Sequence, residues 1–130
     1  MKNGILTALI FMIFSCSANA TISPHLSSEP IEVTNDELVQ YWTMKFNSFS
    51  FNSEPKGKVA SMPKGYVKIR YLIDSDGNTF NASVVESKPV GVWDEQGLLA
   101  IKQMQFAPTT DNDARVPVYV TTVFKFEQGN

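Results

Sequence analysis

The stretch VKIRYLIDSDGNTFNASVVES, residues 67–87, decides the fold. Branched and aromatic side chains occupy every second position of its first seven residues, a period typical of a strand with one face on a core. Residues 74–78 follow with the small and polar side chains of a tight turn. A second strand over 79–87, with Phe80 and Val84 on one face, completes a predicted β-hairpin.

The chain after the hairpin predicts one helix and one long strand. Asp94 is placed to cap a helix over residues 95–103, where Leu98 and Ile101 give an apolar side. Residues 116–126 are rich in β-branched and aromatic side chains, as strands are. The expected fold class is therefore α+β, a two-layer ββαβ sandwich with a three-stranded antiparallel sheet. Its last strand would pair beside the first and leave its other side open.

The residues ahead of the hairpin predict an extra N-terminal helix. Thr34 or Asn35 can cap a helix near 35–45 that carries one apolar face. Residues 21–30, with two prolines and three serines, are expected to lead into it without a fold of their own. The predicted domains are a signal peptide over 1–20, a lead-in with that helix and a connecting segment over 21–62, and the α+β domain over 63–130.

The N-terminus has the pattern of an export signal. Lys2 precedes an almost wholly apolar run over residues 4–14, and Ala18 and Ala20 are small residues at the positions that signal peptidase reads. The run is shorter than the ~20 residues of a membrane-spanning helix, so we expect export and cleavage after Ala20. The alternative is acylation at Cys16, because residues 13–16 loosely resemble a bacterial lipobox.

Composition and motifs argue for binding rather than catalysis. A formal net charge of −2 without a basic stripe excludes a typical nucleic-acid partner. His25 is the only histidine and lies in the lead-in, so no catalytic arrangement, cofactor or small-molecule substrate is expected. The acidic turn that begins at Asp74 resembles the start of a calcium loop, but its twelfth position is Val85 instead of a carboxylate. No metal site is therefore expected.

From Lys64 to Phe126 the pattern resembles the C-terminal domain of the TonB energy-transducer family. The resemblance depends on the order and spacing of several short pieces along about half of the chain. These are Gly65-Tyr66-Val67, Ile69, Tyr71, Ile73-Asp74, Asp76-Gly77, Val84-Val85-Glu86-Ser87, Pro89, Gly91, Trp93-Asp94, Leu98, Ala100, Phe106, Pro108 and Phe124-Lys125-Phe126. The chain departs from the family pattern at Met104, where a tryptophan is common, and at Gly97, where a small residue, often alanine, is usual.

The resemblance implies a binding mode. TonB-like domains bind a short extended segment of outer-membrane transporters by β-augmentation, in which main-chain hydrogen bonds supply much of the attachment. Carried over by position, the receiving edge strand would consist of Val118, Tyr119, Val120, Thr121, Thr122, Val123, Phe124, Lys125 and Phe126. The alternative is that these residues only complete the sheet, or that residues 46–52 cover the edge.

The resemblance also implies a periplasmic protein of a Gram-negative envelope. Full transducers have a membrane-anchored helix and a proline-rich spacer, which this sequence lacks, so an accessory role in transport is expected, with a transporter segment or another envelope protein as partner. The alternative function is structural: an assembly protein that forms homodimers through its edge strand.

Overall fold

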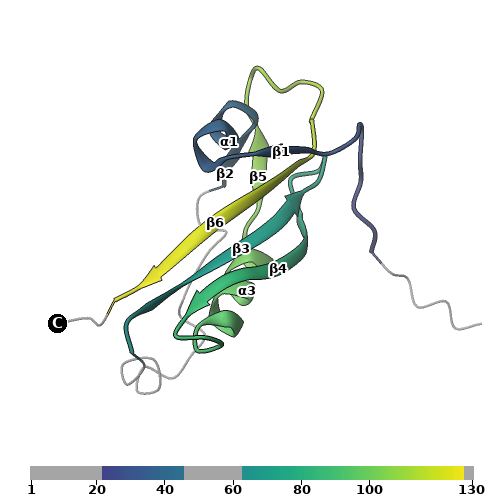
Figure 1. Ribbon diagram of the computed structural model, residues 1–130. Coiled ribbons are helices and arrows are strands. Elements are labelled where there is room, and N and C mark those ends of the chain that lie inside the picture. Colours follow the sequence, from purple (N-terminus) through teal and green to yellow (C-terminus); the bar gives the residue numbers. More distant parts are fainter. Residues whose placement is uncertain (1–21, 46–62, 128–130) are drawn as a thin grey trace, which may run out of the picture.

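The computed structural model of the 130-residue chain describes residues 22–45 and 63–127. Its elements form a four-stranded sheet of order β1-β6-β3-β4 and a two-stranded sheet of β2 and β5 (Figure 1). In chain order they are β1 (Ile31–Val33), α1 (Asn35–Tyr41), β2 (Trp42–Met44), β3 (Gly65–Ile73), β4 (Thr79–Lys88), α3 (Asp94–Gln103), β5 (Phe106–Pro108) and β6 (Val118–Phe126). The α+β class is confirmed. The predicted signal segment, Cys16 and the connection over 46–62 lie outside the described residues.

Strands β6, β3 and β4 form the predicted three-stranded antiparallel sheet. Strand β3 lies in the centre, and its register with β6 runs without a shift from Gly65 opposite Phe126 to Ile73 opposite Val118. Strand β1 adds a fourth, parallel strand on the far side of β6. The hairpin prediction did not include this strand, because three residues of mixed polarity carry no periodic signal of their own.

Two irregularities interrupt the pairing of β3 with β4. Ile69 lies opposite Val84, whereas Leu72 lies opposite Phe80, with a register shift between the two pairs. Ile69 and Leu72 point to opposite faces of β3, so Phe80 and Val84 do as well. The prediction that they share a face was therefore wrong. The reason is a bulge at Asn81, whose φ of 53° breaks the alternation.

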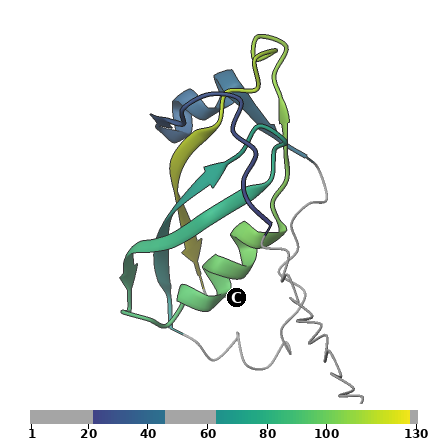
Figure 2. The same ribbon diagram turned by 90° about the vertical axis from the view of Figure 1, so that its right-hand side faces the viewer.

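Helix α3 packs on one face of the sheet and forms the second layer (Figure 2). A Cβ on Gly97 would lie only 2.6 Å from a Val67 methyl carbon and 2.7 Å from one of Ile69. The helix therefore depends on glycine for its close approach to β3. It begins one residue earlier than predicted, and Trp93 rather than Asp94 occupies the N-cap position, without a side-chain capping bond.

Helix α1 begins where predicted but is shorter. Thr34 caps it through a capping box with Glu37, which resolves the choice between the two candidate caps. The helix ends at Tyr41 instead of continuing to residue 45. Trp42 is 1% exposed, donates its ring N–H to the Val116 carbonyl at 2.9 Å and pairs with β5. Tertiary burial of this tryptophan outweighs the local helix preference.

Candidate functional site

Strand β6, the predicted receiving edge, is paired on both sides along only part of its length. On one side it pairs with β3 throughout. On the other side, β1 covers Val118, Tyr119 and Val120. Beyond Val120, no strand among residues 22–45 and 63–127 pairs with this outer side. The prediction of an open edge is therefore wrong for the first third of β6, because β1 occupies it.

Two hydrogen bonds identify which main-chain groups of β6 face outward. Ile31 N–H donates to the Pro117 carbonyl at 3.1 Å, and the Asn35 side chain donates to the Thr121 carbonyl at 2.8 Å. Main-chain groups alternate sides along a regular strand, so those of Val123 and Lys125 also face outward. No described residue pairs with either of them on that side. The uncovered edge thus presents two consecutive sets of outward N–H and C=O groups.

The side chains of β6 alternate between the two faces of the sheet. Val118 and Val120 are fully buried in the core, and Phe124 and Phe126 pack against it. On the opposite face, Val123 is 40% exposed and Lys125 is exposed. The apolar inward side chains hold the strand in place, which leaves its main chain and outward side chains accessible beyond the part that β1 covers.

An ion pair on the outer face holds β1 against the sheet. Arg70 of β3 donates to both carboxylate oxygens of Glu32, at 3.0 and 2.7 Å. Its guanidinium also lies 3.9 Å from the centre of the Tyr119 ring. The hydrogen bond from Arg70 lowers the pKa of Glu32, and the same bond raises the pKa of Arg70. Because both side chains are partly exposed, the pair is worth about 1 kcal/mol or less.

Helix α1 is fastened to β6 just beyond β1. Asn35 donates to the Thr121 carbonyl, and the Thr122 hydroxyl donates to the Asn35 side-chain oxygen at 3.2 Å. The second half of β6 therefore begins where these bonds end. The sequence did not indicate that β1 and Asn35 lie beside the edge of β6. Neither has a local pattern that relates it to β6, which lies almost ninety residues later in the chain.

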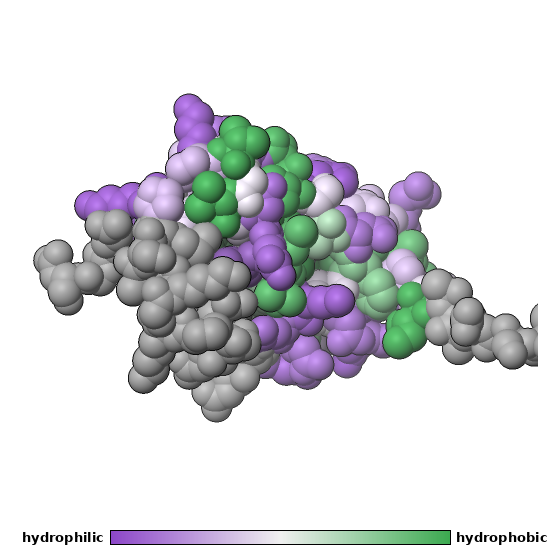
Figure 3. Space-filling view, turned by 90° about the horizontal axis from the view of Figure 1, so that it is seen from below, coloured by the Kyte–Doolittle hydropathy of each residue, from purple (hydrophilic) through white to green (hydrophobic). Residues whose placement is uncertain are grey.

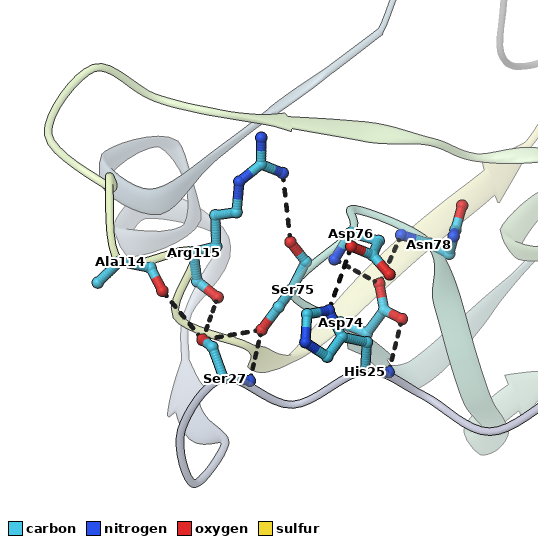
Figure 4. Close-up of polar contacts among 8 residues, drawn as sticks. All are labelled: His25, Ser27, Asp74, Ser75, Asp76, Asn78, Ala114 and Arg115. Carbon is cyan, nitrogen blue, oxygen red and sulfur yellow. Dashed lines mark hydrogen bonds and ion pairs between the residues drawn. The ribbon is translucent and has the colours of Figure 1, made fainter.

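The turn between β3 and β4 is a polar junction built around the Asp74 carboxylate (Figure 4). Asp74 is 2% exposed, and its carboxylate accepts hydrogen bonds from the main-chain N–H groups of His25, Asp76 and Asn78, each at 3.0 Å. Within residues 22–45 and 63–127, no three His, Cys, Asp or Glu side chains gather as they would around a metal ion. The Asp74 carboxylate therefore stabilises the turn by accepting main-chain hydrogen bonds.

The same turn anchors the N-terminal lead-in. Ser75 is fully buried; its N–H donates to the His25 carbonyl at 2.8 Å, and its hydroxyl accepts from the Ser27 N–H at 2.9 Å. Ser27 in turn donates to the carbonyls of Ala114 and Arg115. Residues 22–30 form no helix or strand, yet they are docked on the domain. Ser27 and Ser75 supply the polar contacts that hold this segment, which was expected to have no fold of its own.

His25, the only histidine, takes part in this junction in a structural role. Its Nδ1 lies 3.2 Å from an Asp76 carboxylate oxygen, and both side chains are more than half exposed.

Neither helix in the described ranges combines the length and apolar character needed to cross a membrane.

Comparisons with known proteins agree with this geometry. The family model for the C-terminal domain of the Gram-negative bacterial TonB protein matches residues 55–127, which are 73 of the 130 residues. The solution NMR structure of the Pseudomonas aeruginosa TonB C-terminal domain is similar in fold, with a TM-score of 0.53 and 24% identity. The match covers 66% of this chain and 85% of that domain. A comparison with the curated proteins found no significant match. The chain belongs to the TonB C-terminal domain family, whose members are protein-interaction modules in transport.

Proposed function

We propose that this protein is a periplasmic binding module that receives an extended segment of an outer-membrane transporter along the second half of β6. The observation that supports this most directly is the outward main chain of Val123 and Lys125, which no described residue pairs. A partner strand there would extend the sheet by main-chain hydrogen bonds, and its side chains would contact the two faces of the sheet. The proposal involves no bond making or breaking.

The regular pairing of β6 favours this strand over β4, the other edge of the sheet, as the site of strand addition. Strand β4 also lacks a partner on its outer side among the described residues. However, β4 has two register shifts, and Asn81 in its middle has a positive φ. Bulges of this kind protect edges from strand addition. Strand β6 pairs with β3 without any shift, so its outer side keeps the straight geometry that an added strand needs.

Strand β1 supports the same function because it is a strand added to this edge by the chain itself. It pairs with only three residues of β6, and two of its own three residues are exposed. The edge therefore accepts an extended segment of mixed polarity, with a single buried anchor at Val33. A partner segment bound beyond Thr122 would continue along β6 in the same manner.

Hydrogen–deuterium exchange with and without a synthetic transporter segment tests the proposal. We expect new protection of the Val123 and Lys125 amides on binding, while the amides of β4 exchange as before. Protection confined to β4, or no binding of transporter segments from the same organism, would contradict it.

Two finer expectations from the sequence remain predictions. An accessory role in transport is tested by measuring transport in cells that lack the gene. Self-association through the edge, the alternative function, is tested by sedimentation at several concentrations, where a stable dimer at low micromolar concentration would favour it.

A further inference from the structure

A row of three residues crosses the sheet at the end where β6 finishes. Tyr66 of β3 lies directly opposite Lys125 of β6 on one side and opposite Lys88 of β4 on the other. Side chains of directly opposite residues share a face and lie about 5 Å apart at their Cβ atoms. The two lysines therefore flank the tyrosine ring on the face of the sheet away from α3.

The same row borders a groove of about 600 Å³ at the ends of these three strands. Its other walls include Lys64, Pro89, Val90 and Phe126. Val90 is 89% exposed, an unusual position for an apolar side chain. Figure 3, which views the molecule from below the orientation of Figure 1, shows apolar residues among hydrophilic ones on the surface that is drawn in colour.

The apolar part of the groove has a firm support. The Phe126 ring stacks on Trp93 with centroids 4.0 Å apart and planes within 2°. Trp93 donates its ring N–H to the Pro63 carbonyl at 3.0 Å. A Cβ on Gly65 would lie 2.2 Å from the Lys88 carbonyl oxygen, so the strand ends are packed tightly. The Phe126 wall of the groove and the strand ends beneath it are thus held in place.

The charge around this groove is opposite to that of the whole chain. Lys64, Lys88 and Lys125 line it together with one acid, Glu127. Among the described residues, none of these three lysines is within ion-pair distance of an acid, although Lys88 acts on Glu86 at longer range; Lys68 nearby pairs with Glu86 at 3.0 Å. The chain as a whole carries a formal charge of −2. A concentration of unpaired ammonium groups on an acidic protein indicates a complementary, acidic partner.

From these observations we infer that the partner segment is acidic and apolar where it reaches this groove. The inference rests on the proposed function. Lys125 connects the two sites, because its main chain belongs to the uncovered edge of β6 and its side chain lines the groove. A strand that extends along this edge therefore runs directly to the groove. An apolar side chain fits against Val90 and Phe126, and flanking carboxylates face the lysines.

Calorimetry with designed peptides tests this inference on the chain from Thr21 onward. One peptide alternates Val and Thr and ends in Glu-Leu-Glu, and its matched control ends in Gln-Leu-Gln. Two exposed ion pairs are expected to make the acidic peptide bind about five- to tenfold more tightly. The difference should shrink as salt rises from about 0.05 M to about 0.5 M.

Charge-reversal variants locate the effect. The double variant Lys88→Glu, Lys125→Glu should abolish the preference for the acidic peptide, with binding of the neutral peptide retained. The control Lys102→Glu makes the same kind of change on an exposed residue of α3 and should leave the preference unchanged.

The possible results separate this inference from the function on which it rests. Equal affinity for both peptides would overturn the acidic preference and leave strand addition standing. No binding of either peptide would overturn both. Binding of the chain to phosphatidylglycerol vesicles that the double variant loses, combined with equal peptide affinities, would assign the groove to an anionic lipid surface instead.

Discussion

Proline at position 123 separates the binding role of β6 from its role in the fold. The N–H of Val123 faces away from β3, so Val123→Pro removes a donor from the uncovered edge without removing a bond of the β3–β6 ladder. Proline is tolerated at such edge positions. We therefore expect a folded variant that loses less than about 1 kcal/mol of unfolding free energy.

The loss of binding free energy in Val123→Pro should be larger than its loss of unfolding free energy. One main-chain hydrogen bond is worth about 0.5–1.5 kcal/mol, and the proline ring also displaces the partner strand from the neighbouring Lys125 groups. Together these effects predict a loss of about 2 kcal/mol, or about thirtyfold in Kd, for a transporter segment. Calorimetry measures the affinity, and circular dichroism with urea unfolding verifies the fold.

Two further variants control for shape and for the opposite side of the strand. Val123→Thr keeps both the N–H and the branched shape, so its affinity should match that of the unmodified chain. Thr122→Pro removes an N–H that faces β3 opposite Ile69, and it should destabilise the domain itself. A folded Val123→Pro variant that binds with unchanged affinity would refute strand addition at this edge.

The remaining predictions concern the junctions that hold the site. Asp74→Ala should lower the free energy of unfolding by about 3 kcal/mol in urea titrations, because three main-chain N–H groups lose one buried charged acceptor; the exposed control Asp76→Ala should cost under about 1 kcal/mol. Gly77→Ala should cost more than Gly91→Ala by about 2 kcal/mol in thermal unfolding, since both have positive φ but only at Gly77 would the Cβ meet a carbonyl oxygen, at 2.0 Å; equal losses would contradict this explanation. The lowered pKa of Glu32 means that its contribution is present above its unfolded pKa and is lost as pH falls through the folded value. The protection factors of the β1 amides, which compare each exchange rate with the intrinsic rate at the same pH, should therefore fall in acid. The variant Glu32→Gln should show low β1 protection factors at every pH, and protection factors that still fall in acid in that variant would refute the assignment to this carboxylate.

Several features of the chain could be predicted because their signal is local. The alternation ahead of Asp74 and the glycine-containing turn specify a hairpin, and the branched and aromatic residues of β6 specify a strand with one apolar face. A glycine inside a helix costs about 1 kcal/mol relative to alanine, so Gly97 indicated either close backbone packing or a weak helix start. Its close approach to Val67 and Ile69 agrees with the first of these. The ordered set of short pieces indicated the family, which the match over residues 55–127 confirms.

Other features arise only from contacts between distant parts of the chain. Residues 22–30 have no periodic pattern, and they are docked because Ser27 and His25 meet the buried turn at Asp74 and Ser75. Trp42 lies on the apolar face of a helical pattern, but it forms a strand because its ring N–H donates to the Val116 carbonyl and its main chain pairs with β5. In both cases burial and hydrogen bonding in the folded domain outweigh a weak local preference.

The candidate site shows this division most clearly. By itself, the sequence determined that residues 118–126 form a strand with an inward apolar face, because that property depends only on alternation along one segment. Only the tertiary structure decided which part of the strand is accessible, since its outer side is shared with β1 and Asn35, which lie almost ninety residues earlier. Pairing between distant segments depends on where the whole domain places them, and the three residues of β1 are too few to show a pattern that predicts it.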